Sequence, residues 1–333
     1  MMKKTPIAPC GLLLRVLRCP LLLAVMPALG IAQDYPSKPL RIVVGYPPGG
    51  ANDIIARVVA QKLSEAWGQQ AIVDNRPGAI GVIGTEMVAR SAPDGHTMGV
   101  VSLSPLVFSR FAHAKLPYDS LTDFTPLATL AMTPMLITVH PSLPVHSLKD
   151  LIALAKSQPG KLDFAISGTG GMTHMVLELL RSSTGARLQT VPYKGATPAL
   201  TDTLAGHVQG MVEAFPALSP LVKQGRLRGI AVTSEKRNPL LPDVPSAAEQ
   251  GVRDLVTVNW FGMVAPARIP RPIAEKIHGG LVKIPSQPDV KERFDALGLV
   301  PMTMATPEAY GNFIKSEIAR WGKVAQSAGI KPQ

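Results

Sequence analysis

Short apolar runs alternate with amphipathic stretches through the first third of the chain. Apolar runs at 40–44, 71–73 and 98–101 predict strands, and the stretches 54–67 and 82–90 between them repeat their apolar residues at helical spacing. The stretch 54–67 carries one apolar stripe, so one face of that helix is expected to be buried. This alternation is typical of a parallel sheet covered by helices, which places the chain in the α/β class.

A second series of the same kind follows the turn residues 141–144. A helix is predicted to begin at Ser147, with Asp150 three residues later in a capping-box pattern. Strands are predicted at 162–166, 188–191, 208–212 and 227–232, and helices at 173–184, 197–205 and 216–224. After an extended apolar run at 258–264, three terminal helices are predicted at 270–283, 287–297 and 307–328.

The two series predict two lobes with a ligand cleft between them. The first series has more strand surface than its own helices can cover, so the terminal helices are expected to return to it. The first lobe would comprise 33–135 plus 259–333 and the second 136–258, joined by two crossings near 132–138 and 256–263. Open α/β sheets bind ligands beyond the carboxyl ends of their strands, so the ligand is expected at those ends.

Two glycine-rich turns lie at such strand ends, one in each predicted lobe. The first is 47–53, Pro-Pro-Gly-Gly-Ala-Asn-Asp, and the second is 167–174, Ser-Gly-Thr-Gly-Gly-Met-Thr-His. Each opens a helix, where unpaired backbone N–H groups and the helix dipole favour an anion. The first turn is also compatible with a simple strand-to-helix connection capped by Asn52 or Asp53. The second turn interleaves hydroxyls with glycines but has neither a P-loop ending nor dinucleotide spacing.

Few residues suggest catalytic or metal chemistry. His174 and Glu178 have a spacing that suits two metal ligands on one helix face, but no third ligand is evident nearby. The chain contains no G-x-S-x-G elbow, which leaves Ser167 beside His174 as the remaining arrangement for a nucleophile. We therefore expect no catalysis, no metal and no cofactor.

Three further positions each keep two interpretations. Lys194 either offers a charge to an anion or is a solvated loop lysine. Glu213 either faces the cleft from the end of a strand or is a solvated acid at that end. Trp260 and Phe261 either pack at a hinge or form a wall of the ligand site.

Residues 1–32 resemble a secretory signal peptide. Lys3 and Lys4 precede an apolar region, and the small residues Gly30 and Ala32 suit cleavage near Ala32. The uninterrupted apolar part, 21–32, is about half of the roughly 20 residues that a membrane-spanning helix needs. Export is therefore preferred over a membrane anchor.

Composition adds limits on chemistry and partners. Both cysteines, Cys10 and Cys19, lie in the leader, so the exported chain would have no disulfide and no thiolate. The formal net charge is +11, and +7 without the four Lys and Arg residues of the leader. Because these charges are scattered and aromatic residues make up only 5% of the chain, we expect no nucleic-acid partner.

Around the glycine turns the sequence resembles a known family. The motifs are Pro47-Pro48-Gly49-Gly50 with Asp53, Asp74-Asn75-Arg76-Pro77-Gly78-Ala79, Pro93-Asp94-Gly95-His96-Thr97, Val191-Pro192-Tyr193-Lys194-Gly195, Pro242-Asp243-Val244-Pro245 and Trp260-Phe261-Gly262. In this order they are similar to the periplasmic receptors of tripartite tricarboxylate transporters, the Bug-type solute-binding proteins. The resemblance covers nearly all of the chain after the leader. It implies a type II periplasmic-binding fold that closes on a small carboxylate.

The resemblance also implies where the ligand binds. In the family, backbone amides and hydroxyls of the two turns hold the carboxylate, often with bridging waters. The matching positions, to which we add Ser104, Gly171 and Glu213, are Pro48, Gly50, Ala51, Asp53, Ser167, Gly168, Gly170, Thr173 and His174. Family members usually carry a hydroxyl or small residue at Gly171 and Met172, so Gly171 removes a donor and Met172 adds bulk.

The resulting prediction is a monomeric periplasmic receptor that delivers a small carboxylate to an inner-membrane permease. The alternative is a ligand-sensing periplasmic module that docks on a signalling receptor, and nothing in the sequence separates the two. Dicarboxylates, aromatic acids and amino acids all remain open as ligands.

Overall fold

The structure is a computed structural model and describes residues 1–2, 5–6 and 35–330. The predicted leader and its cleavage position near Ala32 fall almost entirely outside the described residues. Tyr35–Gln333 form one compact unit, distinct from Met1–Asp34, and the following description concerns this unit. Within the described residues, no helix is both long and apolar enough to cross a membrane.

The first series folds into parallel strands with covering helices, as its alternation predicts. Its elements are β1 (Leu40–Val44), α1 (Ala51–Trp67), β2 (Ala71–Asn75), α2 (Val82–Ala89) and β3 (Thr97–Ser102). Strand β1 lies between β2 and β3 and pairs with both in parallel. The apolar stripe of α1, including Ile55, Val59 and Leu63, is buried in one core with Leu40 and Ile42 of β1. Amphipathic spacing therefore predicted both the helix and its buried face.

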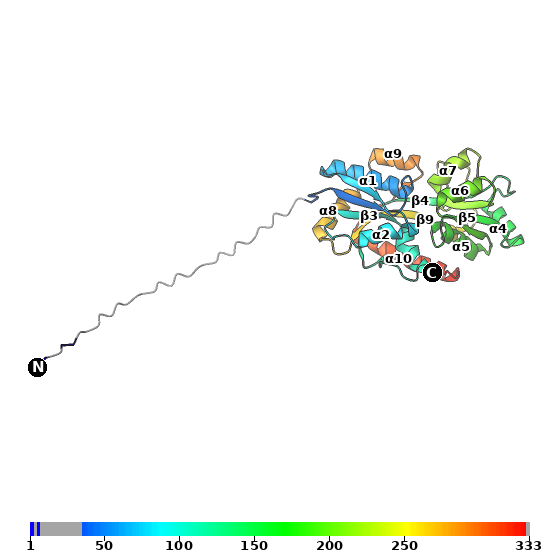
Figure 1. Ribbon diagram of the computed structural model, residues 1–333. Helices are drawn as coiled ribbons and strands as arrows, with labels where there is room; N and C mark the ends of the chain where they lie inside the picture. Colours follow the sequence, from blue (N-terminus) through cyan, green and yellow to red (C-terminus); the bar gives the residue numbers. More distant parts are fainter. Residues whose placement is uncertain (3–4, 7–34, 331–333) are drawn as a thin grey trace. The chain divides into compact units, whose positions relative to one another are not determined.

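The second series repeats this arrangement (Figure 1). Its elements are α4 (Leu148–Ser157), β5 (Asp163–Ile166), α5 (Met172–Thr184), β6 (Gln189–Pro192), α6 (Ala196–Leu204), β7 (Gly210–Ala214), α7 (Phe215–Lys223) and β8 (Arg228–Val232). Strand β5 pairs in parallel with β6 and β7. At the start of α4, the Ser147 side chain accepts from Asp150 N, as the capping pattern predicts.

Two long strands connect the series and make the sheet mixed rather than parallel. They are β4 (Phe124–Val139) and β9 (Val258–Pro266), in the strand order β2-β1-β3-β9-β4-β7-β5-β6, and β8 and β10 (Val300–Pro301) also pair with β4. Strand β9 is antiparallel to β3 and β4, and β4 is antiparallel to β7 and β8. The first half of β4 pairs with β9 as far as Pro134, and the second half pairs with β7 from Met135. Because proline donates no backbone hydrogen bond, the change of partner beside Pro134 interrupts few of them.

The terminal helices are α8 (Arg271–Leu281), α9 (Pro288–Ala296) and α10 (Pro307–Ser327), and the short elements η1 (Ala79–Gly81), η2 (Ser104–Phe108), α3 (Ser109–Ala112) and η3 (Arg253–Leu255) complete the fold. Of the three terminal helices, α8 and α9 pack into the core of the first series, whereas α10 contacts β4 and also α5 of the second series. Ile277 and Leu281 of α8 join the core that contains β1 and α1. Helix α10 lies lower in Figure 1. It carries buried Glu317, whose Oε2 accepts from Nε1 of Trp260, at 3.2 Å, and of Trp321, at 3.3 Å.

Candidate functional site

The first glycine turn joins β1 to α1 and leaves backbone N–H groups unused by the helix. The first hydrogen bond of α1 runs from Ile54 N to Gly50 O at 3.0 Å, so the N–H groups of residues 51–53 precede it. Residues 47–50 are exposed. A Cβ placed on Gly49, which has φ 92°, would have no atom within 4 Å. The first turn is therefore open on its outer side.

Buried Asp53 holds the first turn in shape. Its Oδ2 accepts from Gly49 N and from Arg57 Nε, both at 2.9 Å, and its Oδ1 accepts from Asn75 Nδ2 at 3.0 Å. Burial alone would raise the pKa of Asp53, but these hydrogen bonds, above all that from Arg57, hold the pKa below its ordinary value. Asp53 is the third residue of α1, and its side chain accepts from the N–H of Gly49, the residue before the N-cap Gly50. In a capping box, the third helical residue likewise accepts from a backbone N–H at the start of the helix.

The second glycine turn joins β5 to α5 and is more enclosed. The first bond of α5 runs from Met175 N to Gly171 O at 3.0 Å, which leaves the N–H groups of residues 172–174 ahead of it. Residues 170–173 are buried. A Cβ on Gly170, which has φ 76°, would lie 2.6 Å from the Cβ of Ala112 in α3. Both its conformation and its close neighbour therefore require glycine at this position.

His174 supports the second turn as Asp53 supports the first. It is also the third residue of its helix, and its Nδ1 accepts from Gly170 N at 3.1 Å. Burial lowers the pKa of His174, and Glu178, with Oε1 3.7 Å from Nε2, offsets this only in part. The ring is therefore neutral at pH 7, with its Nδ1 lone pair already used by Gly170.

Ser167 and His174 do not form a nucleophile and base. Nδ1 of His174 accepts from the backbone, while the Ser167 hydroxyl lies 3.3 Å from Thr173 Oγ1, which also accepts from Ser167 N at 3.1 Å. His174 and Glu178 do not form a metal site in the described residues either, because no group of three or more His, Cys, Asp or Glu side chains is arranged to hold an ion there. Thr173 and His174 instead accept hydrogen bonds from the turn backbone, at Ser167 N and Gly170 N.

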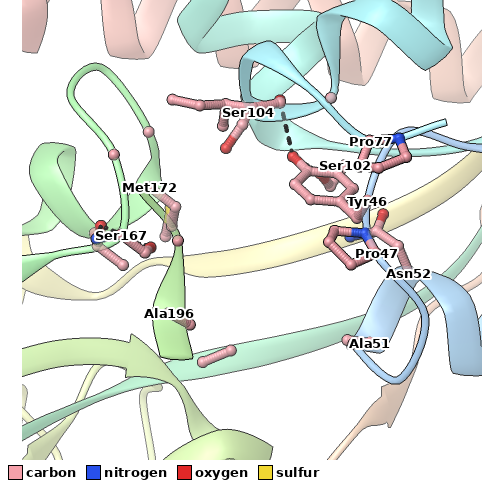
Figure 2. Close-up of a pocket in the computed structure, with 18 of the residues that line it drawn as sticks. Tyr46, Pro47, Ala51, Asn52, Pro77, Ser102, Ser104, Ser167, Met172 and Ala196 are labelled. Atoms are coloured by element: carbon pink, nitrogen blue, oxygen red, sulfur yellow. Dashed lines mark hydrogen bonds between the residues drawn. The ribbon is translucent and has the colours of Figure 1, made fainter. Parts of the chain in front are cut away.

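Both turns open into one cavity of about 970 Å³. Nine of the twelve predicted ligand residues line it, namely Pro48, Gly50, Ala51, Ser104, Ser167, Gly168, Gly171, Thr173 and Glu213. Asp53, Gly170 and His174 are not among the lining residues; Asp53 and His174 instead hold the turns by accepting from Gly49 N and Gly170 N. Figure 2 shows Pro47, Ala51 and Asn52 on one side of the space and Ser167 and Met172 on the other. The volume suits a small organic ligand.

Several lining residues lie outside the predicted ligand set. They include the segments 77–81 and 193–198 together with Tyr46, Ser102, Met135, Asn259 and Phe261. Both segments contain glycine motifs that carry the family resemblance, so a signal for them was present in the sequence. Lys194 is exposed, as a solvated loop lysine would be, and it also lines the cavity, where its charge is available to an anion. Phe261 lines the cavity, whereas Trp260 is packed in the core.

The loop 77–81 carries backbone strain where it meets the second turn. Ile80 has φ 53°, a left-handed conformation that is costly for a β-branched residue. Tyr46 holds the loop by donating from its hydroxyl to Ile80 O at 3.0 Å. A Cβ on Gly168 would lie 2.9 Å from Ile80 Cδ1, and one on Gly171 would lie 3.6 Å away. Ile80 of the first series therefore fills space left by two glycines of the second.

Most polar side chains in the cavity are neutral. Burial raises the pKa of Tyr46 to about 12, and its hydroxyl lies 3.2 Å from Ser102 Oγ (Figure 2). Among the described lining residues, the charged side chains are Lys194 and Glu213. Burial raises the pKa of Glu213, although the N–H of Ala214, 2.8 Å from Oε1, opposes this rise. Anion binding here would therefore depend largely on backbone N–H groups and hydroxyls.

Comparison with known proteins gives one consistent family. The family described as "Tripartite tricarboxylate transporter family receptor" matches residues 55–330. Protein BugT of Bordetella pertussis is 37% identical over 301 residues, which cover 90% of this chain and 92% of that protein.

Two solved structures share the fold of this chain. Rpa4515 of R. palustris with adipate has a TM-score of 0.83 and 35% identity, and the match covers 90% of this chain and 100% of that one. MatC (Rpa3494) from Rhodopseudomonas palustris with bound malate has a TM-score of 0.79 and 29% identity, and the match covers 87% of this chain and 100% of that one.

Proposed function

This chain belongs to the family of tripartite tricarboxylate transporter receptors, and from that premise we propose that it binds a small carboxylate between its two glycine turns. The observation that carries the proposal is the meeting of two helix N-termini, those of α1 and α5, at one cavity. Their free N–H groups and helix dipoles favour an anion. The relatives Rpa4515 and MatC hold adipate and malate, which are both small carboxylates.

The two turns can bind an anion without a Lys or Arg side chain at either turn. The N–H groups of residues 51–53 and 172–174 precede the first helical bonds, and Ser104, Ser167 and Thr173 add hydroxyls. Asp53 and His174 act here as positioning residues, because they fix the turns through Gly49 N and Gly170 N. Like its relatives, the protein acts as a binding protein, and capture proceeds without catalysis.

Ligand capture closes two lobes, 33–135 plus 259–333 and 136–258. The partner change in β4 at Pro134–Met135 and the start of β9 at Val258 support these boundaries. The ligand need only bind the closed form better than the open form to shift the equilibrium between them. The closed form then docks on an inner-membrane permease, after export to the periplasm with cleavage near Ala32.

Isothermal titration with a panel of small mono- and dicarboxylates tests the ligand class. We expect at least one carboxylate to bind at a single site and to raise the midpoint of thermal unfolding as its concentration rises. Protein purified without ligand that binds no member of the panel would contradict the proposal. Permease genes beside the coding sequence would support delivery, whereas a sensor gene pair there would support docking on a signalling receptor.

A further inference from the structure

The loop 78–81 has a positive φ at each of its four residues. The angles are 143° at Gly78, 46° at Ala79, 53° at Ile80 and 91° at Gly81. The two glycines adopt such angles readily, but Ala79 and above all the β-branched Ile80 do so at a cost. Backbone strain of this kind persists only where the surrounding structure holds the chain in place. Ile80 therefore occupies a position whose backbone would suit glycine better.

The first series supplies the support that holds this loop. Tyr46 donates from its hydroxyl to Ile80 O at 3.0 Å, and Gly81 N donates to Gly78 O at 3.0 Å. A Cβ on Gly45, which directly follows β1, would lie 2.6 Å from Gly81 O. The loop backbone and the end of β1 are thus in close contact. The loop is therefore fixed to the part of the molecule that carries the first glycine turn.

The side chain of Ile80, in contrast, reaches the second glycine turn. A Cβ on Gly168 would lie 2.9 Å from Ile80 Cδ1. Because a carbon–carbon bond is about 1.5 Å long, Cδ1 lies at most about 4.4 Å from Gly168 Cα, which is within van der Waals contact. A Cβ on Gly171 would lie 3.6 Å from both Cδ1 and Cγ2 of Ile80. All three residues line the cavity, so an apolar contact joins the two series beside it.

A contact between the two lobes acts on their closure. Separation of the lobes would expose the apolar surface of Ile80 that faces the second turn, and this exposure is unfavourable. A contact made only in the closed form raises the population of that form, and the apparent affinity rises with the population that is competent to bind. Because the contact lies between protein atoms, its contribution is the same for every ligand.

We propose that Ile80 stabilises the closed form of the receptor by packing against Gly168 and Gly171, and that it thereby tightens binding without selecting among ligands. The inference rests on the proposed function and adds a positioning residue outside the predicted ligand set. The strained backbone places the side chain across the cavity from its own support, and the two glycines leave the space that it fills.

The variant Ile80→Gly tests the inference because it removes the side chain and the strain together. Glycine suits the backbone at this position, so the midpoint of thermal unfolding without ligand should stay unchanged or rise. Titration calorimetry should nevertheless show the affinity reduced about fivefold, and by the same factor for succinate, glutarate and adipate. Ile80→Val, which lacks only Cδ1, should give a smaller loss that is again independent of ligand length.

Arg268→Gly is the matched control. Arg268 also has a positive φ, 67°, but it is exposed and outside the cavity lining, so all affinities should stay unchanged. Unchanged affinities in Ile80→Gly would overturn this inference alone. A loss that varies with the length of the diacid would also overturn it, because Ile80 would then act by touching the ligand. No binding of any small carboxylate by the wild type would contradict the proposed function itself.

Discussion

The two glycine turns present similar backbone chemistry to one cavity but are built by different means. The first is exposed, and a charged residue, Asp53, accepts three hydrogen bonds to hold it. The second is buried over residues 170–173, and a neutral ring, that of His174, holds it while Ala112 and Ile80 lie against its glycines. An anion site at a helix N-terminus therefore needs fixed N–H groups, and the surroundings decide whether charge or packing fixes them.

Removing the charge from the first turn should have the largest effect. Asp53→Ala leaves the Gly49 N–H and the Asn75 amide without an acceptor and Arg57 without its partner, so the free energy of unfolding should fall by about 3 kcal/mol. Carboxylate affinity should fall at least about tenfold because the turn is no longer fixed. Chemical denaturation and calorimetry measure both quantities.

A matched carboxylate supplies the control for this variant. Asp289 also lies in the first turn of a helix, α9, but is exposed and away from the cavity. Asp289→Ala should change stability little and leave ligand affinity unchanged. Equal effects of the two variants would show that Asp53 acts only as an ordinary helix-end charge.

Adding a methyl group should separate packing from backbone strain. Gly170→Ala combines φ 76° with a contact of 2.6 Å to Ala112 Cβ, so it should destabilise by about 3 kcal/mol. Gly49→Ala meets no atom within 4 Å and bears only the strain of φ 92°, about 1 kcal/mol. Thermal and denaturant unfolding compare the two variants. Equal losses of stability would show that the close contact with Ala112 does not stabilise the second turn.

Acid should weaken the second turn before the first. The pKa of His174 is lowered from 6.5, so its contribution to stability is complete above about pH 6.5 and is lost as the pH falls through the lowered pKa. The pKa of Asp53 is lowered from 3.8, so its contribution persists until the pH falls below about 3.8. Unfolding free energies of wild type and His174→Gln should therefore converge between these limits. Parallel pH profiles would contradict this order.

Restoring a hydroxyl to the second turn should have the smallest effect. A Cβ on Gly171 would meet Gly168 O at 3.5 Å and Ile80 Cδ1 at 3.6 Å, which are ordinary contacts. Gly171→Ser should therefore change stability by less than about 1 kcal/mol while adding a donor beside the cavity. Carboxylate affinity should change a few-fold, by calorimetry. A loss of stability as large as that of Gly170→Ala would show that the turn tolerates no side chain.

Local patterns in the sequence predicted most of the secondary structure. Helices and parallel strands follow from spacing, and the stripe on α1 identified its buried face. Strand β4 was predicted only in part, as an extended crossing near 132–138, because Pro126, Pro134 and interspersed threonines interrupt its apolar pattern, and register shifts follow Pro126 in the ladder. Its antiparallel pairing depends on contacts with β9, more than a hundred residues away, which no local pattern encodes.

The candidate site was predicted by its turns and less well by single side chains. Asp53 and His174 are residue types that often contact ligands. Each is also the third residue of its helix, a position from which a side chain can accept from the backbone N–H of the residue before the N-cap. Both do so, Asp53 from Gly49 N and His174 from Gly170 N. The N-cap residues, Gly50 and Gly171, have no side chain that could cap the helix. The sequence therefore already indicated that another residue in the first turn of the helix would take this role. Tyr46 and Asn259 carry no such signal, because isolated polar residues reach the cavity only through the tertiary fold.

The shared carboxylate of Glu317 gives the protein an internal optical probe. Trp260 stands between Asn259 and Phe261, which line the cavity, and its indole and that of Trp321 donate to the same buried oxygen. Indole emission responds to the field of a nearby negative charge, so any shift of β9 on ligand capture would change the intrinsic fluorescence. With only three tryptophans in the chain, stopped-flow mixing can follow capture and release in unlabelled protein.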